Sequence, residues 1–126
     1  MTGNEYQELA MRTNNHKASE CVAKTLCCHD QHTQDVCGIM NAALGLSGEV
    51  GELNDMIKKW IFHEKPIDML HLKKEIGDVC WYIAMMCEAW GFNLEQIMQL
   101  NINKLKERYP EGFDVVRANN RKDGDI

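Results

Sequence analysis

The feature that most constrains this fold is a pair of long segments in which apolar residues recur every three or four positions. The first runs from Ile39 to Trp60 and the second from Leu72 to Trp90. This spacing places the apolar side chains along one side of an α-helix, so each segment predicts a long amphipathic helix. A short polar connection containing Pro66 separates them, and proline ends a helical continuation. Because short connections between long helices favour antiparallel neighbours, the sequence predicts a helical bundle.

The rest of the chain is also expected to be helical, because the alternation of apolar and polar residues that is typical of strands is hard to find and there are only two prolines. The expected class is all-α, an antiparallel bundle of about four to five helices. We expect a single domain over residues 1–113 and a flexible polar tail over 114–126. The helices are expected at about residues 4–13, 17–29, 35–62, 68–90 and 94–109.

Residues 79–87, VCWYIAMMC, carry no charge on any side of their helix. A helix that is apolar all round must be covered all round, and a domain of this size has few helices to do so. We therefore expect completion of the bundle by oligomerisation, as a homodimer or homotetramer. A well-wrapped monomer is the alternative.

Composition excludes several function classes. The 126 residues are 44% hydrophobic and 26% charged, as in soluble globular proteins. No apolar stretch approaches the ~18 residues of a membrane span, so we expect no membrane partner. The net charge of −5 argues against a nucleic-acid polymer as partner.

The six cysteines bear on localisation and on a possible zinc site. Without a secretory signal at the N-terminus, reduced thiols and a cytoplasmic localisation are expected. The segment 27–37, CCHDQHTQDVC, gathers three Cys and two His, but its spacing matches no zinc pattern. An ordinary polar connection is the favoured interpretation, and its role stays open.

Four acids carry the candidate chemistry: Glu49, Glu52, Glu75 and Asp78. The two acids of each pair, Glu49 with Glu52 and Glu75 with Asp78, are three residues apart and therefore share a helix face. Each acid directly precedes an apolar position of its helix, so both pairs lie beside the seam, the line along which the two helices would pack. On antiparallel helices the pairs can face each other. Four crowded carboxylates repel one another and are costly to desolvate, and hard oxygen ligands suit Mg²⁺, with Mn²⁺ as a plausible substitute. The sequence therefore predicts a metal site; solvated acids paired with nearby lysines are the alternative.

Gly51 and Gly77 occupy the middle position of the two acid motifs. Glycine inside a helix costs about 1 kcal/mol relative to alanine, so we expect that room is needed at both positions. Gly45 and Gly48 extend the surface of small residues.

Three segments, ALGLSGEVGEL, KEIGDVCWYI and KLKERYPEGF, resemble the MazG-type nucleotide pyrophosphohydrolases, an all-α superfamily. The resemblance covers roughly residues 39–113. It implies Mg²⁺-dependent hydrolysis of a (deoxy)nucleoside triphosphate to the monophosphate and pyrophosphate, with a role in clearing unwanted nucleotides. It assigns the metal to the four acids.

The resemblance also implies substrate contacts. Tyr82 matches a position that lines the nucleoside pocket, and Lys104 and Arg108 match basic residues that meet phosphates. Asn101 shares their helix face. Asn41 and Lys59 are further candidate substrate residues from their spacing to the acids.

Glu49 and Glu52 are the candidates for the catalytic acid that takes a proton from the attacking water. Many family members carry an additional Glu directly before the first motif acid, where this chain has Gly48. That departure favours one alternative, a non-catalytic helical module for metal binding or oligomerisation. Another is a hydrolase of the same fold acting on a different nucleotide such as phosphoribosyl-ATP. The base, the sugar and the phosphorus attacked are not determined by the sequence.

Overall fold

The structure, a computed structural model, describes residues 1–27 and 35–120. The described residues form six helices and no strand, which confirms the all-α class. The chain divides into two compact units, Met1–Val36 and Cys37–Ile126. Each is described by itself here, and the single domain predicted over 1–113 stays a prediction.

The first unit contains α1 (Gly3–Met11) and α2 (Ala18–Cys27). Thr2 caps α1 in a capping box with Glu5, in which each side chain bonds the other residue's backbone N–H. Both helices were predicted, but the expected end of α2 at residue 29 lies outside the described residues. So does most of the cysteine and histidine segment.

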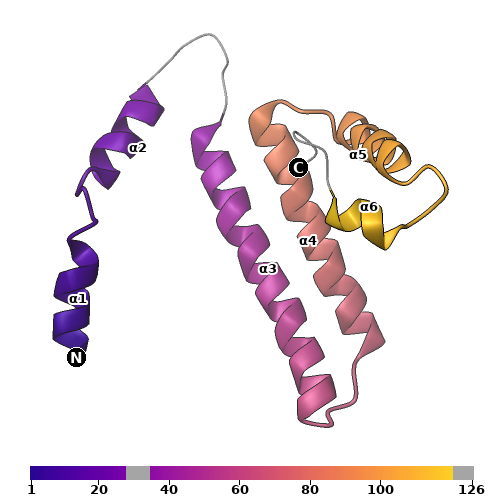
Figure 1. The fold of residues 1–126 in the computed structure, drawn as a ribbon, viewed down its shortest axis with the longest axis horizontal. Helices are drawn as coiled ribbons and strands as arrows, with labels where there is room; N and C mark the ends of the chain where they lie inside the picture. Colours follow the sequence, from indigo (N-terminus) through magenta and orange to yellow (C-terminus); the bar gives the residue numbers. More distant parts are fainter. Residues whose placement is uncertain (28–34, 121–126) are drawn as a thin grey trace. The chain divides into compact units, whose positions relative to one another are not determined.

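The second unit is built on a hairpin of two long helices, α3 (Val36–Phe62) and α4 (Met69–Trp90) (Figure 1). Their bounds match the predicted helices to within one residue. Asp68 starts α4, because its carboxylate accepts the backbone N–H of Leu70 at 2.9 Å and of His71 at 3.1 Å. Gly91 ends it in the left-handed conformation, at φ 69°.

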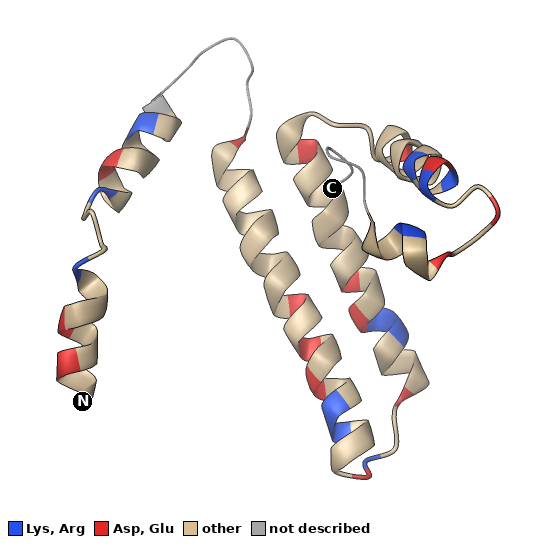
Figure 2. Cartoon of the chain, in the orientation of Figure 1, with Lys and Arg blue, Asp and Glu red and all other residues tan. Residues whose placement is uncertain are grey.

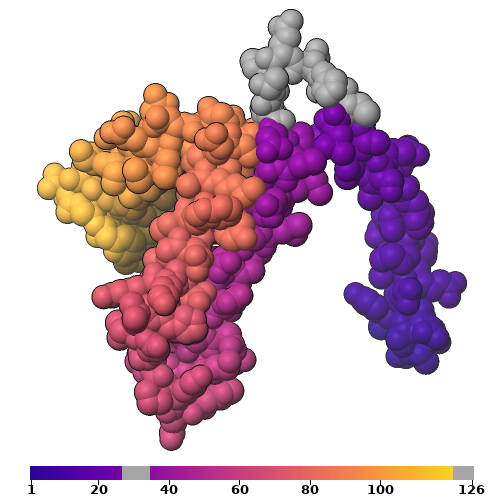
Figure 3. Space-filling model, turned by 180° about the vertical axis from the view of Figure 1, so that it is seen from behind, coloured from indigo at the N-terminus to yellow at the C-terminus, as the bar shows by residue number. Residues whose placement is uncertain are grey.

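The contacts between α3 and α4 establish that the two helices are antiparallel. The Asn41 amide lies 3.8 Å from the sulfur of Met85. One turn further along α3, Gly45 faces the ring of Tyr82, which lies earlier in α4. The space-filling view shows the two helices packed against each other (Figure 3).

Two shorter helices complete the unit, α5 (Leu94–Arg108) and α6 (Val115–Asn119). Asn93 caps α5, since its side chain accepts the N–H of Gln96 at 3.1 Å. Helix α6 was not predicted, because the sequence reading placed it in a flexible tail. Its signal is Asp114, whose carboxylate accepts the N–H of Arg117 at 2.8 Å.

The core of the described chain is small. Its buried apolar residues are Ala42, Cys87 and Ala89, and no large side chain is fully buried. The predicted oligomer would cover more apolar surface, and it stays a prediction. None of the described helices combines the length and hydropathy needed to cross a membrane.

Candidate metal centre

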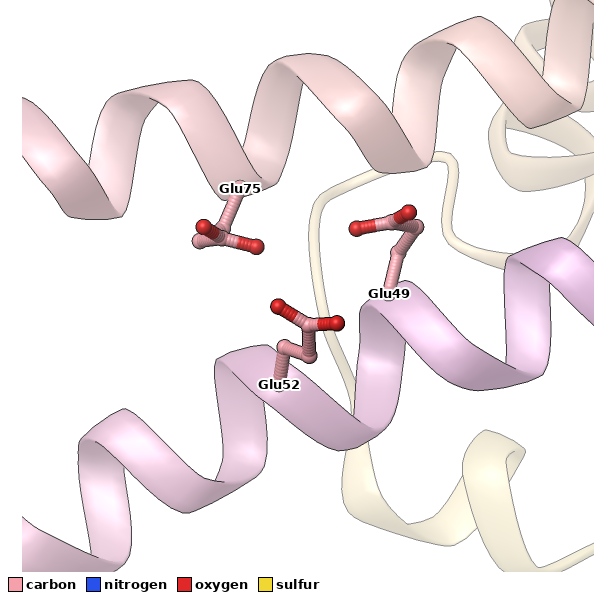
Figure 4. Close-up of side chains that lie close together, drawn as sticks. All are labelled: Glu49, Glu52 and Glu75. Atoms are coloured by element: carbon pink, nitrogen blue, oxygen red, sulfur yellow. The ribbon is translucent and has the colours of Figure 1, made fainter.

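Three of the four predicted acids converge between α3 and α4. Glu49 and Glu52 project from α3 and Glu75 from α4, with their carboxylates pointing toward one another (Figure 4). One oxygen of each carboxylate lies within 4.8 Å of the others. Carboxylates from two facing helices at this separation have the donor chemistry that a hard divalent cation requires.

The antiparallel register explains this convergence. Because α3 and α4 run in opposite directions, the later acid of the first pair, Glu52, meets the earlier acid of the second pair, Glu75. The same register brings Asp78 toward Glu49. Asp78 is exposed and lies outside the group of three, but its charge acts on Glu49. The structure thus groups three of the predicted ligands and leaves the fourth beside them.

Charge repulsion is visible at Glu49. Partial burial raises the pKa of this carboxyl, and repulsion by Glu52, Asp78 and Glu75 raises it further. A bound cation would relieve this repulsion, which is the physical reason for placing a metal among these acids.

Glu75 is the buried member of the cluster, with 7% of its surface exposed. Its Oε1 lies 2.7 Å from Nε2 of His71, one turn earlier in α4. This contact orients the Glu75 carboxylate. The sequence analysis did not single out His71, although its spacing of four residues from Glu75 was a usable signal.

Nearby lysines do not neutralise the four acids. Lys58 and Lys59 both pair with Asp55, at 3.0 Å and 2.5 Å. Hydrogen bonds from Lys59 and then Lys58 lower the pKa of Asp55. Within residues 1–27 and 35–120, none of the four acids forms an ion pair with a lysine. The alternative of acids balanced by lysines is therefore not what the structure shows.

A cavity of about 380 Å³ adjoins the acids and extends toward the connection between α3 and α4. Glu52 and Glu75 line it at the acid cluster. Three basic side chains line the same space: Lys59, Lys65 and His71. Charged residues of the hairpin gather in this region, toward the connection (Figure 2). The cavity therefore offers both carboxylates for a cation and cationic groups for an anion.

The predicted substrate residues lie in different places. Lys59 lines the cavity. Tyr82 and Asn41 lie along the hairpin on the other side of the acids, toward the start of α3, where Asn41 is exposed and Tyr82 half-buried. A Cβ at Gly45 would overlap the Tyr82 ring, so only glycine allows this ring to lie against α3.

The predicted residues of α5 are not brought to the acids. Asn101 and Lys104 are exposed and Arg108 is half-buried, and none of them lines the cavity. The guanidinium of Arg108 lies 5.9 Å from the ring centroid of Tyr109, on the same chain segment. Their role in substrate binding stays a prediction.

The packing of the described chain does not itself require glycine at Gly51 or Gly77, and the expectation that room is needed there stays a prediction. A Cβ at either position would meet no atom of the chain within 4 Å, and Gly51 lines the cavity. The same holds for Gly48. Among the four helical glycines of this region, only Gly45 lies so close to another side chain that a Cβ would clash with it.

Comparisons with known proteins show the family to which the chain belongs. Residues 39–113 match the family model described as the MazG nucleotide pyrophosphohydrolase domain. The chain is also 31% identical over 88 residues to the Gene 37 protein of Mycobacterium phage L5, which is 67% of this chain and 77% of that protein. No solved structure matches significantly.

Proposed function

This chain belongs to the MazG nucleotide pyrophosphohydrolase family, and from that premise we propose that it hydrolyses a (deoxy)nucleoside triphosphate to the monophosphate and pyrophosphate with Mg²⁺. The observation that carries the proposal is the convergence of Glu49, Glu52 and Glu75 within 4.8 Å. Among the described residues none of the three pairs with a lysine, and Glu52 and Glu75 line a cavity that also holds basic groups.

The donor set fits Mg²⁺, with Mn²⁺ as a substitute. Glu49, Glu52 and Glu75 would hold the ion, and Asp78 would complete the set from its position beside Glu49. Mg²⁺ keeps several positions for water and phosphate oxygens, so a site of few carboxylates suits it. When bound, the ion would neutralise charge on the phosphates and lower the pKa of a bound water.

Glu49 is the better candidate for the group that accepts a proton from the attacking water. Partial burial and then its acidic neighbours raise the pKa of Glu49 in the absence of a metal ion, so this carboxylate takes up a proton more readily than an ordinary glutamate. Glu52 remains the other candidate. With Gly48 in place of a further Glu, one of these two acids must supply the base.

The substrate would lie along the hairpin with its phosphates at the acids. Lys59 and Lys65 supply cationic groups within the cavity for phosphate oxygens, and the His71 imidazole lines the same space. Tyr82 and Asn41, further toward the start of α3, would meet the nucleoside. Asn101, Lys104 and Arg108 are retained as phosphate-binding candidates on α5.

We further propose a homo-oligomer, a dimer or tetramer, located in the cytoplasm and acting in nucleotide-pool house-cleaning. The exposed apolar surface of the hairpin supports the oligomer.

The test is product analysis with each common dNTP and NTP in the presence of Mg²⁺. Pyrophosphate with the matching monophosphate is expected for one or a few nucleotides. Glu49→Gln and Asp78→Asn should abolish turnover and keep the helical circular dichroism, whereas Glu88→Gln, at an exposed acid near the end of α4, should not.

Orthophosphate as the sole product would contradict the proposed displacement. Stabilisation by Mg²⁺ with no product from any nucleotide would instead favour the non-catalytic module. In that case Gly48→Glu is the first restoration to make, because a side chain there meets open space.

A further inference from the structure

Glu75 differs from the two converging acids of α3, because its carboxylate is both buried and bonded by a neighbouring side chain. Glu49 is half-buried and Glu52 is exposed, whereas Glu75 is buried. A buried carboxylate is costly unless its oxygens accept hydrogen bonds. The Oε1 atom of Glu75 lies 2.7 Å from Nε2 of His71, so the imidazole provides the donor that this buried acid needs.

The geometry of α4 allows His71 to reach this carboxylate. The two residues are four apart and therefore share a face of the helix. Side chains on a helix lean toward its N-terminus, so the side chain of Glu75 leans toward the turn that carries His71. The imidazole itself stays exposed, and it therefore loses little solvation when it bonds the buried acid.

The start of α4 fixes the backbone from which the imidazole projects. The carboxylate of Asp68 caps the helix and accepts the backbone N–H of His71 at 3.1 Å. Two hydrogen bonds, one from the backbone of His71 and one from its ring, therefore hold this residue between the cap and Glu75. The ring has a defined position at the edge of the acid cluster.

Among the three converging acids, Glu75 is the one that α4 contributes. The other two belong to α3, so the third carboxylate has to be presented across the seam. A carboxylate has two oxygens, and the imidazole bonds Oε1. Oε2 is therefore the oxygen that a cation can use while the bond to His71 persists. If Glu75 turned away, only the two acids of α3 would remain in the group.

We propose that His71 is a positioning residue of the metal centre, which donates its Nε2–H to Oε1 of Glu75 and thereby holds Oε2 for the ion. The inference rests on the proposed function, and it adds a residue that the donor set does not contain. Residues that bond a metal ligand typically change metal affinity or activity by about 10–100-fold when they are replaced. Because His71 also lines the cavity, direct contact with the substrate is the competing role.

Binding of Mn²⁺ to the nucleotide-free chain, followed by electron paramagnetic resonance, tests this role without any turnover. In His71→Asn the shorter amide reaches the place of Nδ1 but not that of Nε2, and the Mn²⁺ dissociation constant should rise by about 10–100-fold. In His71→Gln an amide N–H lies near the place of Nε2 and should restore most of the lost affinity. The control is His63→Asn, at an exposed histidine just after the end of α3, which should leave Mn²⁺ binding unchanged.

A double-mutant cycle keeps the test decisive if His71→Asn does not fold, because Glu75→Ala removes the buried charge that this variant would leave without a donor. In the Glu75→Ala background, His71→Asn should lower Mn²⁺ affinity no further, since the imidazole then has no carboxylate to hold. A further loss there would overturn the inference. So would a folded His71→Asn that binds Mn²⁺ as tightly as the wild type.

Nucleotide kinetics separate positioning from contact with the substrate. At saturating Mg²⁺, His71→Asn should leave the KM for the nucleotide close to that of the wild type. A raised KM with unchanged Mn²⁺ affinity would show that His71 meets the substrate, and it would overturn the inference. Weaker Mn²⁺ binding by His71→Asn, with no turnover of any nucleotide by the wild type, would contradict the proposed function and support the positioning role.

Discussion

The two sides of the α3–α4 hairpin have opposite chemistry although neighbouring residues build them. Glu49 precedes Val50 and Glu75 precedes Ile76, and each step of one residue turns the helix by about 100°. The acids face the contact between the two helices, while the residue after each acid lies on the apolar side of the hairpin. The apolar side consists of exposed large hydrophobic residues: Val50, Ile57, Ile61, Ile76, Ile83 and Trp90. Adjacent residues of the same helix therefore build a polar site on one side of the hairpin and an apolar surface on another. A shift of one residue in either helix would turn its acids about 100° away from the seam.

The largest expected effect comes from substitution at adjacent positions on α4. Glu75→Gln removes a charge from the proposed metal site, and because metal-assisted stabilisation amounts to several kcal/mol, turnover should fall roughly 10²-fold or more. Its oligomeric state should stay that of the wild type. Ile76→Glu should do the reverse, weakening association with a smaller effect on Mg²⁺ binding, measured by calorimetry. If both variants lose both properties, the two sides are not independent.

Substitution of Gly45 tests how much the close packing of α3 against α4 contributes to stability. Gly45→Ala would place a methyl group 2.0 Å from the nearest atom of the Tyr82 ring. Overpacking of this kind typically costs about 1–3 kcal/mol of folding stability. We expect a clearly lower melting temperature and, if Tyr82 meets the nucleoside, a higher KM. Gly77→Ala is the control, because its methyl group meets open space and should stabilise α4 by up to about 1 kcal/mol. Equal effects would show that the Tyr82 contact is not needed.

The acid side should respond to pH through Glu49, whereas the apolar side should not. A raised pKa means that the folded protein holds a proton on Glu49 at pH values where the unfolded chain has lost it. Without metal, this group therefore stabilises the fold at low pH, and that contribution is lost as pH rises through the raised pKa. Stabilisation by Mg²⁺ should increase over the same range, because the ion needs the deprotonated carboxylate.

Thermal melts with and without Mg²⁺, from about pH 4 to pH 8, would measure this pH dependence. The variant Glu49→Gln should flatten it. A Mg²⁺ effect that is constant across the range would argue against Glu49 as a ligand.

The smallest expected effect is a difference in KM between substitutions at two neighbouring lysines. Lys58 and Lys59 both pair with Asp55, but only Lys59 lines the cavity. Lys59→Gln should raise KM by roughly two- to fivefold, a modest change because the side chain is partly exposed and its charge is screened. Lys58→Gln should leave KM unchanged. An equal effect of both would show that the pairing with Asp55 matters rather than the contact with substrate.

Much of the second unit was predictable because its signals are local. The apolar period, Asp68 and Asn93 as caps and Gly91 as a stop depend on neighbouring residues alone, and the bounds of α3, α4 and α5 follow closely. Helix α6 was missed because five residues show no periodicity. The close contact of Gly45 with the Tyr82 ring was not predicted, because spacing reveals which residues share a face but not what stands opposite them.

By itself, the sequence determined the all-α class, the long hairpin and the pairing of the acids, since helical period and capping are properties of a continuous segment. Only the tertiary structure decided which acids meet. The register of α3 on α4 places Glu75 with Glu49 and Glu52 and leaves Asp78 outside that group of three. It also decided that Gly45, rather than Gly51 or Gly77, receives a neighbouring ring. Distances across a seam depend on how two helices are set against each other, and that information lies in neither helix alone.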